Sequence, residues 1–187
     1  MSSSDHNSRS FRLKRKEGAQ AGVRRIARGR AENAIETLRN ADADFAASIH
    51  GARKDLKKLR AVLRLVCEDL DGDLFRAENQ RYRDAGRLLS RSRDAEVKLE
   101  TLLGLQSHFQ ADLPGGAAGP WTRTLERERD EASGAAGSDP AAQVEQAMAA
   151  IAEGCDRIAD WPLENDSWQL VGPGLARSYR GGRRTLR

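Results

Sequence analysis

Between Ala52 and Val66 the large apolar residues recur every three or four positions, which is the spacing of one face of an α-helix. On a helical wheel of about 100° per residue, these residues share one sector, well separated from the charged residues. They are Ala52, Leu56, Leu59, Leu63 and Val66. Because an apolar face of this kind must be buried against other elements, the segment predicts a helix within a bundle.

The rest of the chain favours the same fold class. No run alternates apolar with polar residues as a half-buried strand does, and Val and Ile are sparse among abundant Ala, Arg, Leu and Glu. Only 5% of residues are aromatic, so the core must be built from Leu, Ala and Ile. We therefore predict an all-α fold, an antiparallel helical bundle.

Capping residues and helix breakers divide the chain into expected elements. Residues 1–16 form a basic tail that we expect to be disordered, followed by a helix over residues 17–39. Asp42 and Asp44 are candidate N-caps of a second helix that ends near Leu70. A third helix is expected from Leu74 to about Ser90, and residues 91–105 either continue it or form a fourth helix from Ser92 to near Gly104.

After Gln110 the composition changes, with Gly-rich linkers around a short acidic helix and a longer one that Asp139 caps and Pro140 begins. A last basic helix is expected after Pro173 and Gly174. The predicted organisation is a basic helical bundle over residues 17–110, a linker with acidic helices over 111–166, and a second basic region over 167–187.

The net charge of +4 conceals an uneven distribution. Residues 121–166 contain 4 Arg against 11 Asp plus Glu, a net charge of −7, which leaves +11 for the rest of the chain. Such a division favours a polyanionic partner for the basic part, although a solvated surface of mixed charge is the ordinary alternative.

The predicted second helix carries most of this positive charge on one side, which we call the basic stripe. Its members are His50, Arg53, Lys54, Lys57, Arg60 and Arg64, and Lys58 beside them is a further candidate for the site. Like charges three or four residues apart repel one another by a few tenths of a kcal/mol per pair, and the one acid in the segment, Asp55, lies off the stripe. The next helix has a similar row of Arg76, Arg83 and Arg87. The pattern favours an anion-binding surface over a merely solvated face.

His50 has more than one possible role. A metal site is disfavoured because no second His, Cys or carboxylate stands three or four residues away. Surrounding cations favour a hydrogen bond from the imidazole to a phosphate oxygen, while packing at a helix crossing is the structural alternative. Cys67 and Cys155 lie in helical segments, and we expect buried free thiols.

These residues resemble the signature of the CHAD family, the conserved-histidine α-helical domain. The frame H-x-x-R-K-x-x-K-K-L-R-x-x-x-R over residues 50–64 carries most of the likeness. Arg93 and Asp94 resemble the family's following R-D motif, and Tyr179, Arg180, Arg183 and Arg184 resemble the stretch that opens its second half. The likeness runs from about Gly18 to Arg187.

The resemblance implies two pseudo-symmetric helical bundles with a basic surface that binds inorganic polyphosphate without catalysis. We expect this chain to contain the first bundle and only the start of the second. The implied partners are polyphosphate and polyphosphate granules, with no cofactor and no metal. The candidate polyphosphate site combines the basic stripe and Lys58 with the row of Arg76, Arg83 and Arg87 and with Arg180, Arg183 and Arg184 of the second-half stretch.

Two other functions remain open. RNA or DNA would meet the same charges, but nucleic-acid sites usually add aromatic residues for stacking, and Phe75 and Tyr82 suit the core better. A metal-dependent phosphate-handling enzyme would need a P-loop or clustered carboxylates, which are lacking.

With no apolar run long enough to span a membrane and no apolar leader, we expect a cytoplasmic protein without a membrane partner.

Overall fold

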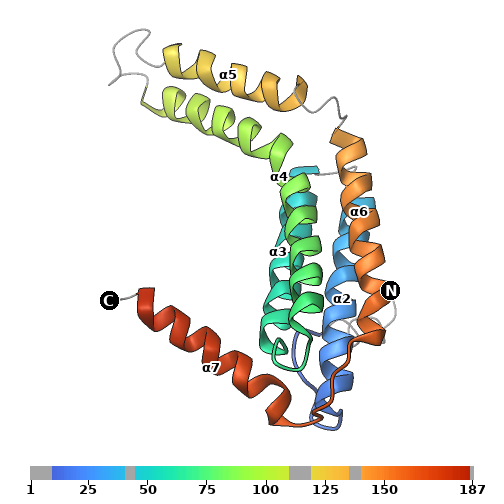
Figure 1. Cartoon of the computed structure of the whole chain (residues 1–187). Helices are drawn as coiled ribbons and strands as arrows, with labels where there is room; N and C mark the ends of the chain where they lie inside the picture. Colours follow the sequence, from blue (N-terminus) through green and yellow to red (C-terminus); the bar gives the residue numbers. More distant parts are fainter. Residues whose placement is uncertain (1–9, 41–44, 110–118, 135–139, 186–187) are drawn as a thin grey trace. The chain divides into compact units, whose positions relative to one another are not determined.

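The computed structural model describes residues 10–40, 45–109, 119–134 and 140–185 (Figure 1). These residues form six α-helices, labelled α2 to α7, and one short 3-10 helix, η1, with no strand among them. The all-α prediction is confirmed. The chain divides into two compact units, one comprising Met1–Gly86 with Ala147–Arg187 and the other Arg87–Gln146.

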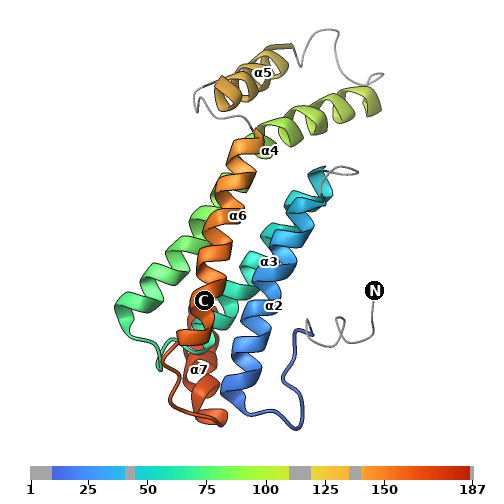
Figure 2. The ribbon, with the colours of Figure 1, turned by 90° about the vertical axis from the view of Figure 1, so that its right-hand side faces the viewer.

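The first unit is built around α2 (Ala19–Arg39) and α3 (Phe45–Leu65), which pack side by side (Figures 1 and 2). Small residues allow the close approach, since Ala27, Ala31 and Ala52 are completely buried. A Cβ added at Gly51 would lie 3.2 Å from the Thr37 Cγ2 of α2. Glycine at this poor helical position is thereby explained by the crossing of the two helices.

The apolar face predicted for α3 is confirmed. Ala52, Leu56, Leu59, Leu63 and Val66 are all 2% exposed or less. Tyr82, on α4 (Gly72–His108), is fully buried and Phe75 is half-buried, as expected of core and rim positions. The last part of α6 (Pro140–Arg157) and η1 (Ile158–Asp160) complete this core with Ile151, Ile158 and other apolar side chains.

Buried charges in this core are paired. Asp55 accepts hydrogen bonds from Arg30 Nη1 at 2.9 Å and Asn33 Nδ2 at 2.5 Å, both on α2. Glu78 is 1% exposed and accepts a bond from Arg157 Nε at 2.8 Å, which links α4 to α6. Removing one partner of such a pair is costly because the other remains buried and uncompensated.

Several helix boundaries differ from those predicted. α3 ends at Leu65 rather than near Leu70, and a turn follows. α4 is a single helix from Gly72 to His108, so the segment after Ser90 continues it. α7 runs from Trp168 to Thr185, starting before Pro173 rather than after it. The predicted caps Asp42, Asp44 and Asp139 lie outside the described residues.

The turn after α3 anchors a distant loop. Asp69 accepts hydrogen bonds from the backbone N–H groups of Glu164 and Asn165 at 3.1 and 3.0 Å. In the same loop, Asp166 accepts a 2.7 Å bond from the N–H of Gln20 at the start of α2. These contacts fix the path from η1 to α7.

Part of the expected disordered tail is held against α2. Arg25 donates to the carbonyl oxygens of Ser10 at 3.0 Å and Arg12 at 2.9 Å, and it also pairs with Glu17. Hydrogen bonding from Arg25 lowers the pKa of Glu17, against a smaller opposing effect of burial. Residues 10–17 therefore form an anchored segment, while residues 1–9 are outside the described part.

The second unit contains the distal part of α4 and α5 (Gly119–Gly134). Lys98 and Glu128 form an ion pair at 3.2 Å, and Gln106 donates a 3.1 Å bond to Thr122. The unit ends at Gln146, so residues 147–166, which we grouped with the acidic helices, pack in the first unit. None of the described helices has an apolar stretch of the length that a membrane span requires.

Candidate functional site

The basic stripe lies on one continuous helix, α3. His50, Lys54, Lys57 and Arg64 are exposed, and Arg53 and Arg60 are half-buried. Since seven helical residues rise about 10.5 Å, His50, Lys57 and Arg64 are spaced evenly along the helix. Asp55 is buried against Arg30 and Asn33 of α2, and within its own helix it pairs with Lys58.

Lys58, beside the stripe, and Arg60, within it, contact neighbouring residues. Lys58 lies 3.5 Å from Asp55 Oδ1, and its ammonium group is 5.7 Å from the centroid of the Phe11 ring. Arg60 donates a 2.9 Å hydrogen bond from Nε to Asn79 Oδ1 on α4. Lys58 is thus placed on the flank of the stripe, and Arg60 is held in a fixed orientation beside α4.

The second row, on α4, is less uniform than its spacing predicted. Arg76 forms an ion pair with Asp73, one turn earlier, and both side chains are largely exposed. Arg83 is exposed next to Asp84, which accepts hydrogen bonds from Gln80. Arg87 belongs to the second unit. Arg76 and Arg83 remain in the first unit with the stripe, but acids dilute their charge.

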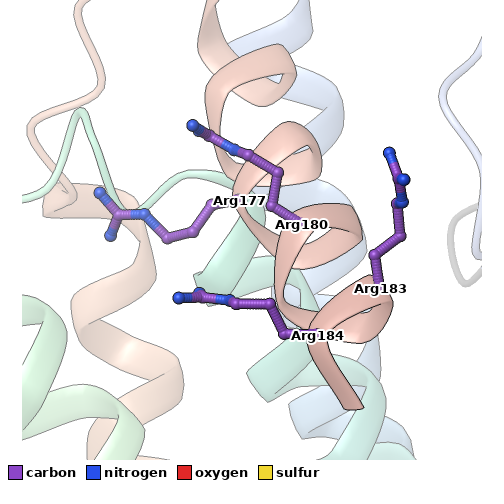
Figure 3. A pocket seen from close by; sticks show the side chains of 4 residues that line it. All are labelled: Arg177, Arg180, Arg183 and Arg184. Carbon is purple, nitrogen blue, oxygen red and sulfur yellow. The ribbon is translucent and has the colours of Figure 1, made fainter. Parts of the chain in front are cut away.

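A second group of cations lies on α7. Arg177, Arg180, Arg183 and Arg184, which we call the arginine cluster, line an open hollow of about 550 Å³ (Figure 3). In Figure 3 the Arg177 and Arg184 side chains extend in the same direction, while Arg183 points away from them. Sequence reasoning identified three of the four and missed Arg177, whose spacing of three from Arg180 and seven from Arg184 was the available signal.

α7 meets the end of α3. A Cβ at Gly174 would overlap the carbonyl oxygens of Arg64 and Leu65, so only glycine permits this approach. Arg177 forms an ion pair with Glu68 in the turn after α3, and its Nη1 lies 3.6 Å from the Cys67 sulfur. The arginine cluster therefore begins beside the Arg64 end of the basic stripe.

The cysteines and Tyr82 lie in the packed interior of the first unit or at its edge. Cys67 and Cys155 are free thiols, of which Cys155 is buried as expected and Cys67 is only half-buried. Burial raises the pKa of Cys155. Burial also raises the pKa of Tyr82, with the Glu78 carboxylate adding to the effect. In the described part of the chain, no group of three or more His, Cys, Asp or Glu could hold a metal ion. The side chains of Arg93 and Asp94 lie outside the described residues.

Comparison with known proteins identifies the family of this chain. The family model described as the CHAD domain matches residues 22–187. Searches of curated proteins and of solved structures give no match. The match includes the whole basic stripe and the arginine cluster. The chain thus belongs to the CHAD domain family, whose members are associated in general with polyphosphate binding.

Proposed function

We propose that the protein binds inorganic polyphosphate, without catalysis, through the basic stripe of α3 and the arginine cluster of α7. The observation that carries the proposal is the contact between the two helices at Gly174, which puts the arginine cluster beside the Arg64 end of the stripe. Arg76 and Arg83 contribute additional positive charge from α4.

The chemistry of the ligand suits this surface. A linear phosphate polymer presents nearly uniform negative charge, so its recognition needs spaced cations rather than a shaped pocket. Arginine can hold phosphate oxygens with two parallel hydrogen bonds, and lysine adds a compact charge. Because binding releases counterions, the affinity should fall steeply with salt, as it does for nucleic acids.

The test uses paired charge reversals that alter net charge equally. Lys57→Glu/Arg64→Glu changes the stripe, Arg180→Glu/Arg184→Glu changes the arginine cluster, and Arg39→Glu/Arg123→Glu changes exposed arginines elsewhere. Charge-assisted contacts are worth about 1.5 to 3 kcal/mol each when well formed and less when exposed. Calorimetric titration should therefore show a loss of about tenfold to hundredfold for the first two variants. An equal loss in the control would reduce the proposal to an effect of net charge.

A second candidate, single-stranded RNA, is favoured by one residue. Tyr179, which is also on α7, is 67% exposed and could stack on a base. Tyr179→Ala should leave polyphosphate affinity unchanged, whereas RNA recognition would lose about 1 to 3 kcal/mol. Titrating polyphosphate and an RNA of equal charge at two salt concentrations decides between the ligands. Unchanged polymer length after incubation with Mg²⁺ checks the absence of catalysis.

A further inference from the structure

An apolar pocket of about 240 Å³ lies in the first unit, between the anchored segment and helices α2, α3 and α7. Phe11 and Leu13 form one wall, Trp168 and Leu175 of α7 form another, and aliphatic side chains of α2 and α3 lie between them. Among the described residues that line it, Arg12 is the only charged one. The pocket is chemically unlike the hollow of the arginine cluster.

The walls are unusually exposed for large apolar side chains. Phe11, Leu13 and Leu175 are 45–48% exposed, and Trp168 is 68% exposed. Isolated apolar residues are common on protein surfaces, but a contiguous group around a pocket marks an interaction site. These exposed apolar side chains therefore indicate that a binding partner covers the pocket.

The pocket is preformed. Arg25 fixes the backbone on both sides of Phe11 through the carbonyl oxygens of Ser10 and Arg12. Leu13 contacts α2 at Gly22. A Cβ at Gly22 would lie only 2.5 Å from the Cδ2 atom of Leu13, so glycine makes room for the leucine side chain. A preformed pocket binds with a smaller loss of conformational entropy.

Size indicates what the pocket can accept. Small-molecule sites commonly measure about 300 to 1,000 Å³, and this pocket of about 240 Å³ is smaller. It suits a single large apolar side chain, the kind of anchor that dominates the energetics of many protein interfaces. The dimensions therefore favour a protein segment over a free metabolite.

The charges beside the pocket indicate which residues would flank the inserted side chain in the partner. The exposed Arg12 guanidinium makes no hydrogen bond or ion pair within the described part of the chain, and Lys14, Arg15 and Lys16 follow it in the anchored segment. The Lys58 ammonium lies over the Phe11 ring. The segment's acid, Glu17, is already paired with Arg25. Arg12 at the pocket and Lys58 over Phe11 make this side of the pocket cationic and complementary to carboxylates.

We propose that this pocket docks an acidic segment of a partner protein, which inserts one large apolar side chain between Trp168, Leu175 and the anchored segment. Aspartate and glutamate residues flanking that anchor would face Arg12 and its neighbours. Polyphosphate has no apolar groups and would not occupy this pocket. Docking of a peptide here is therefore independent of the proposed polyphosphate binding.

A selection from a displayed library of random 16-residue peptides tests the proposal, with the full chain as target and Trp168→Ser/Leu175→Ser as counter-target. Selected sequences should carry a large apolar residue flanked by Asp or Glu. Synthetic copies, measured by fluorescence anisotropy, should bind the double variant at least tenfold more weakly. Arg12→Glu should weaken binding about fivefold and reduce its salt dependence.

Controls separate the pocket from folding and from the anion site. Trp121, in the second unit, is 68% exposed like Trp168, so Trp121→Ser should leave peptide binding unchanged. The double variant should retain its helical circular dichroism, its melting temperature and its polyphosphate affinity. Retained polyphosphate affinity with lost peptide binding supports the proposal independently of the proposed function.

Three results would overturn it. The first is that no peptide prefers the native chain to the double variant, or that the selected sequences are neutral or basic. The second is a dimer, seen by light scattering, that Trp168→Ser/Leu175→Ser dissociates, because the occupant would then be a second copy of the chain. The third is Trp168-dependent binding to anionic lipid vesicles that exceeds peptide binding.

Discussion

At the scale of single residues, glycines and buried charges decide how the helices approach one another. Gly174 lets α7 reach the last carbonyl groups of α3, and Gly154 leaves room for the Tyr82 hydroxyl, which would lie 2.5 Å from an added Cβ. The sequence could not identify these positions because each glycine's neighbour comes from a distant part of the chain. The paired role of Asp55, buried against Arg30, was hidden for the same reason.

Gly174→Ala and Gly181→Ala form a matched pair within α7. The first Cβ overlaps backbone carbonyl groups that cannot move aside, so we expect the free energy of unfolding to fall by about 1 to 3 kcal/mol. The second Cβ meets no described atom within 4 Å, and alanine is the better helix former, so stability should rise by up to about 1 kcal/mol. Denaturant titration measures both. Equal effects would contradict the contact with α3.

His50→Gln separates the roles left open for the histidine. The His50 side chain is exposed, and the core contact at this point of α3 comes from the adjacent Ile49, which is 1% exposed. The change should therefore leave the melting temperature almost unaltered. Polyphosphate affinity should fall severalfold if, as proposed, the imidazole donates a hydrogen bond to a phosphate oxygen. A lowered melting temperature with normal affinity would assign His50 a structural role instead.

At the scale of elements, sequence patterns predicted which segments are helical better than where the helices end. The periodicity of α2 and α3 was sufficient, because their apolar faces pack on each other. α7 was expected too late because Gly172, Pro173 and Gly174 resemble a break. In the structure, Ser167 Oγ accepts a 3.2 Å bond from the N–H of Gln169 and begins the helix earlier. Proline then costs one internal hydrogen bond within it.

The turn after α3 predicts a specific dependence of stability on pH. Burial alone would raise the pKa of Asp69, but hydrogen bonds from the backbone and side chain of Asn165, and from Glu164, hold it below the ordinary value. A carboxyl with a lowered folded-state pKa stabilises the protein above its unfolded pKa of about 4 and loses that contribution as the pH falls further.

Asp69→Ala should therefore lower the free energy of unfolding at pH 7 by about 1.5 kcal/mol or more, since hydrogen bonds to a charged group are lost. The difference between variant and native chain should shrink as the pH falls from about 4 towards 2. Urea titrations across this range measure it. A difference that is independent of pH would show that the ionised carboxylate is not what holds the loop.

At the scale of the whole chain, the unequal distribution of charge is partly a division between units. The sequence predicted the acidic region but placed its boundaries by linkers, whereas the structure places them by packing. Ile151, Ile158 and Trp161, each 1% exposed or less, belong to the core of the first unit although acids surround them in the sequence. No local pattern distinguishes such residues, because their burial depends on contacts with α2 and α4.

The acidic residues of the second unit should not contribute contacts to a polyanion. Their carboxylates repel phosphate at distances shorter than the screening length of about 8 Å at physiological salt. Glu126 and Asp130 of α5 and Glu145 of α6 are exposed. The triple change Glu126→Gln/Asp130→Asn/Glu145→Gln should leave polyphosphate affinity unchanged or raise it two- to threefold in calorimetric titration. A loss of tenfold would contradict the assignment of the site to α3 and α7, and a tenfold gain would show that these acids compete with the ligand.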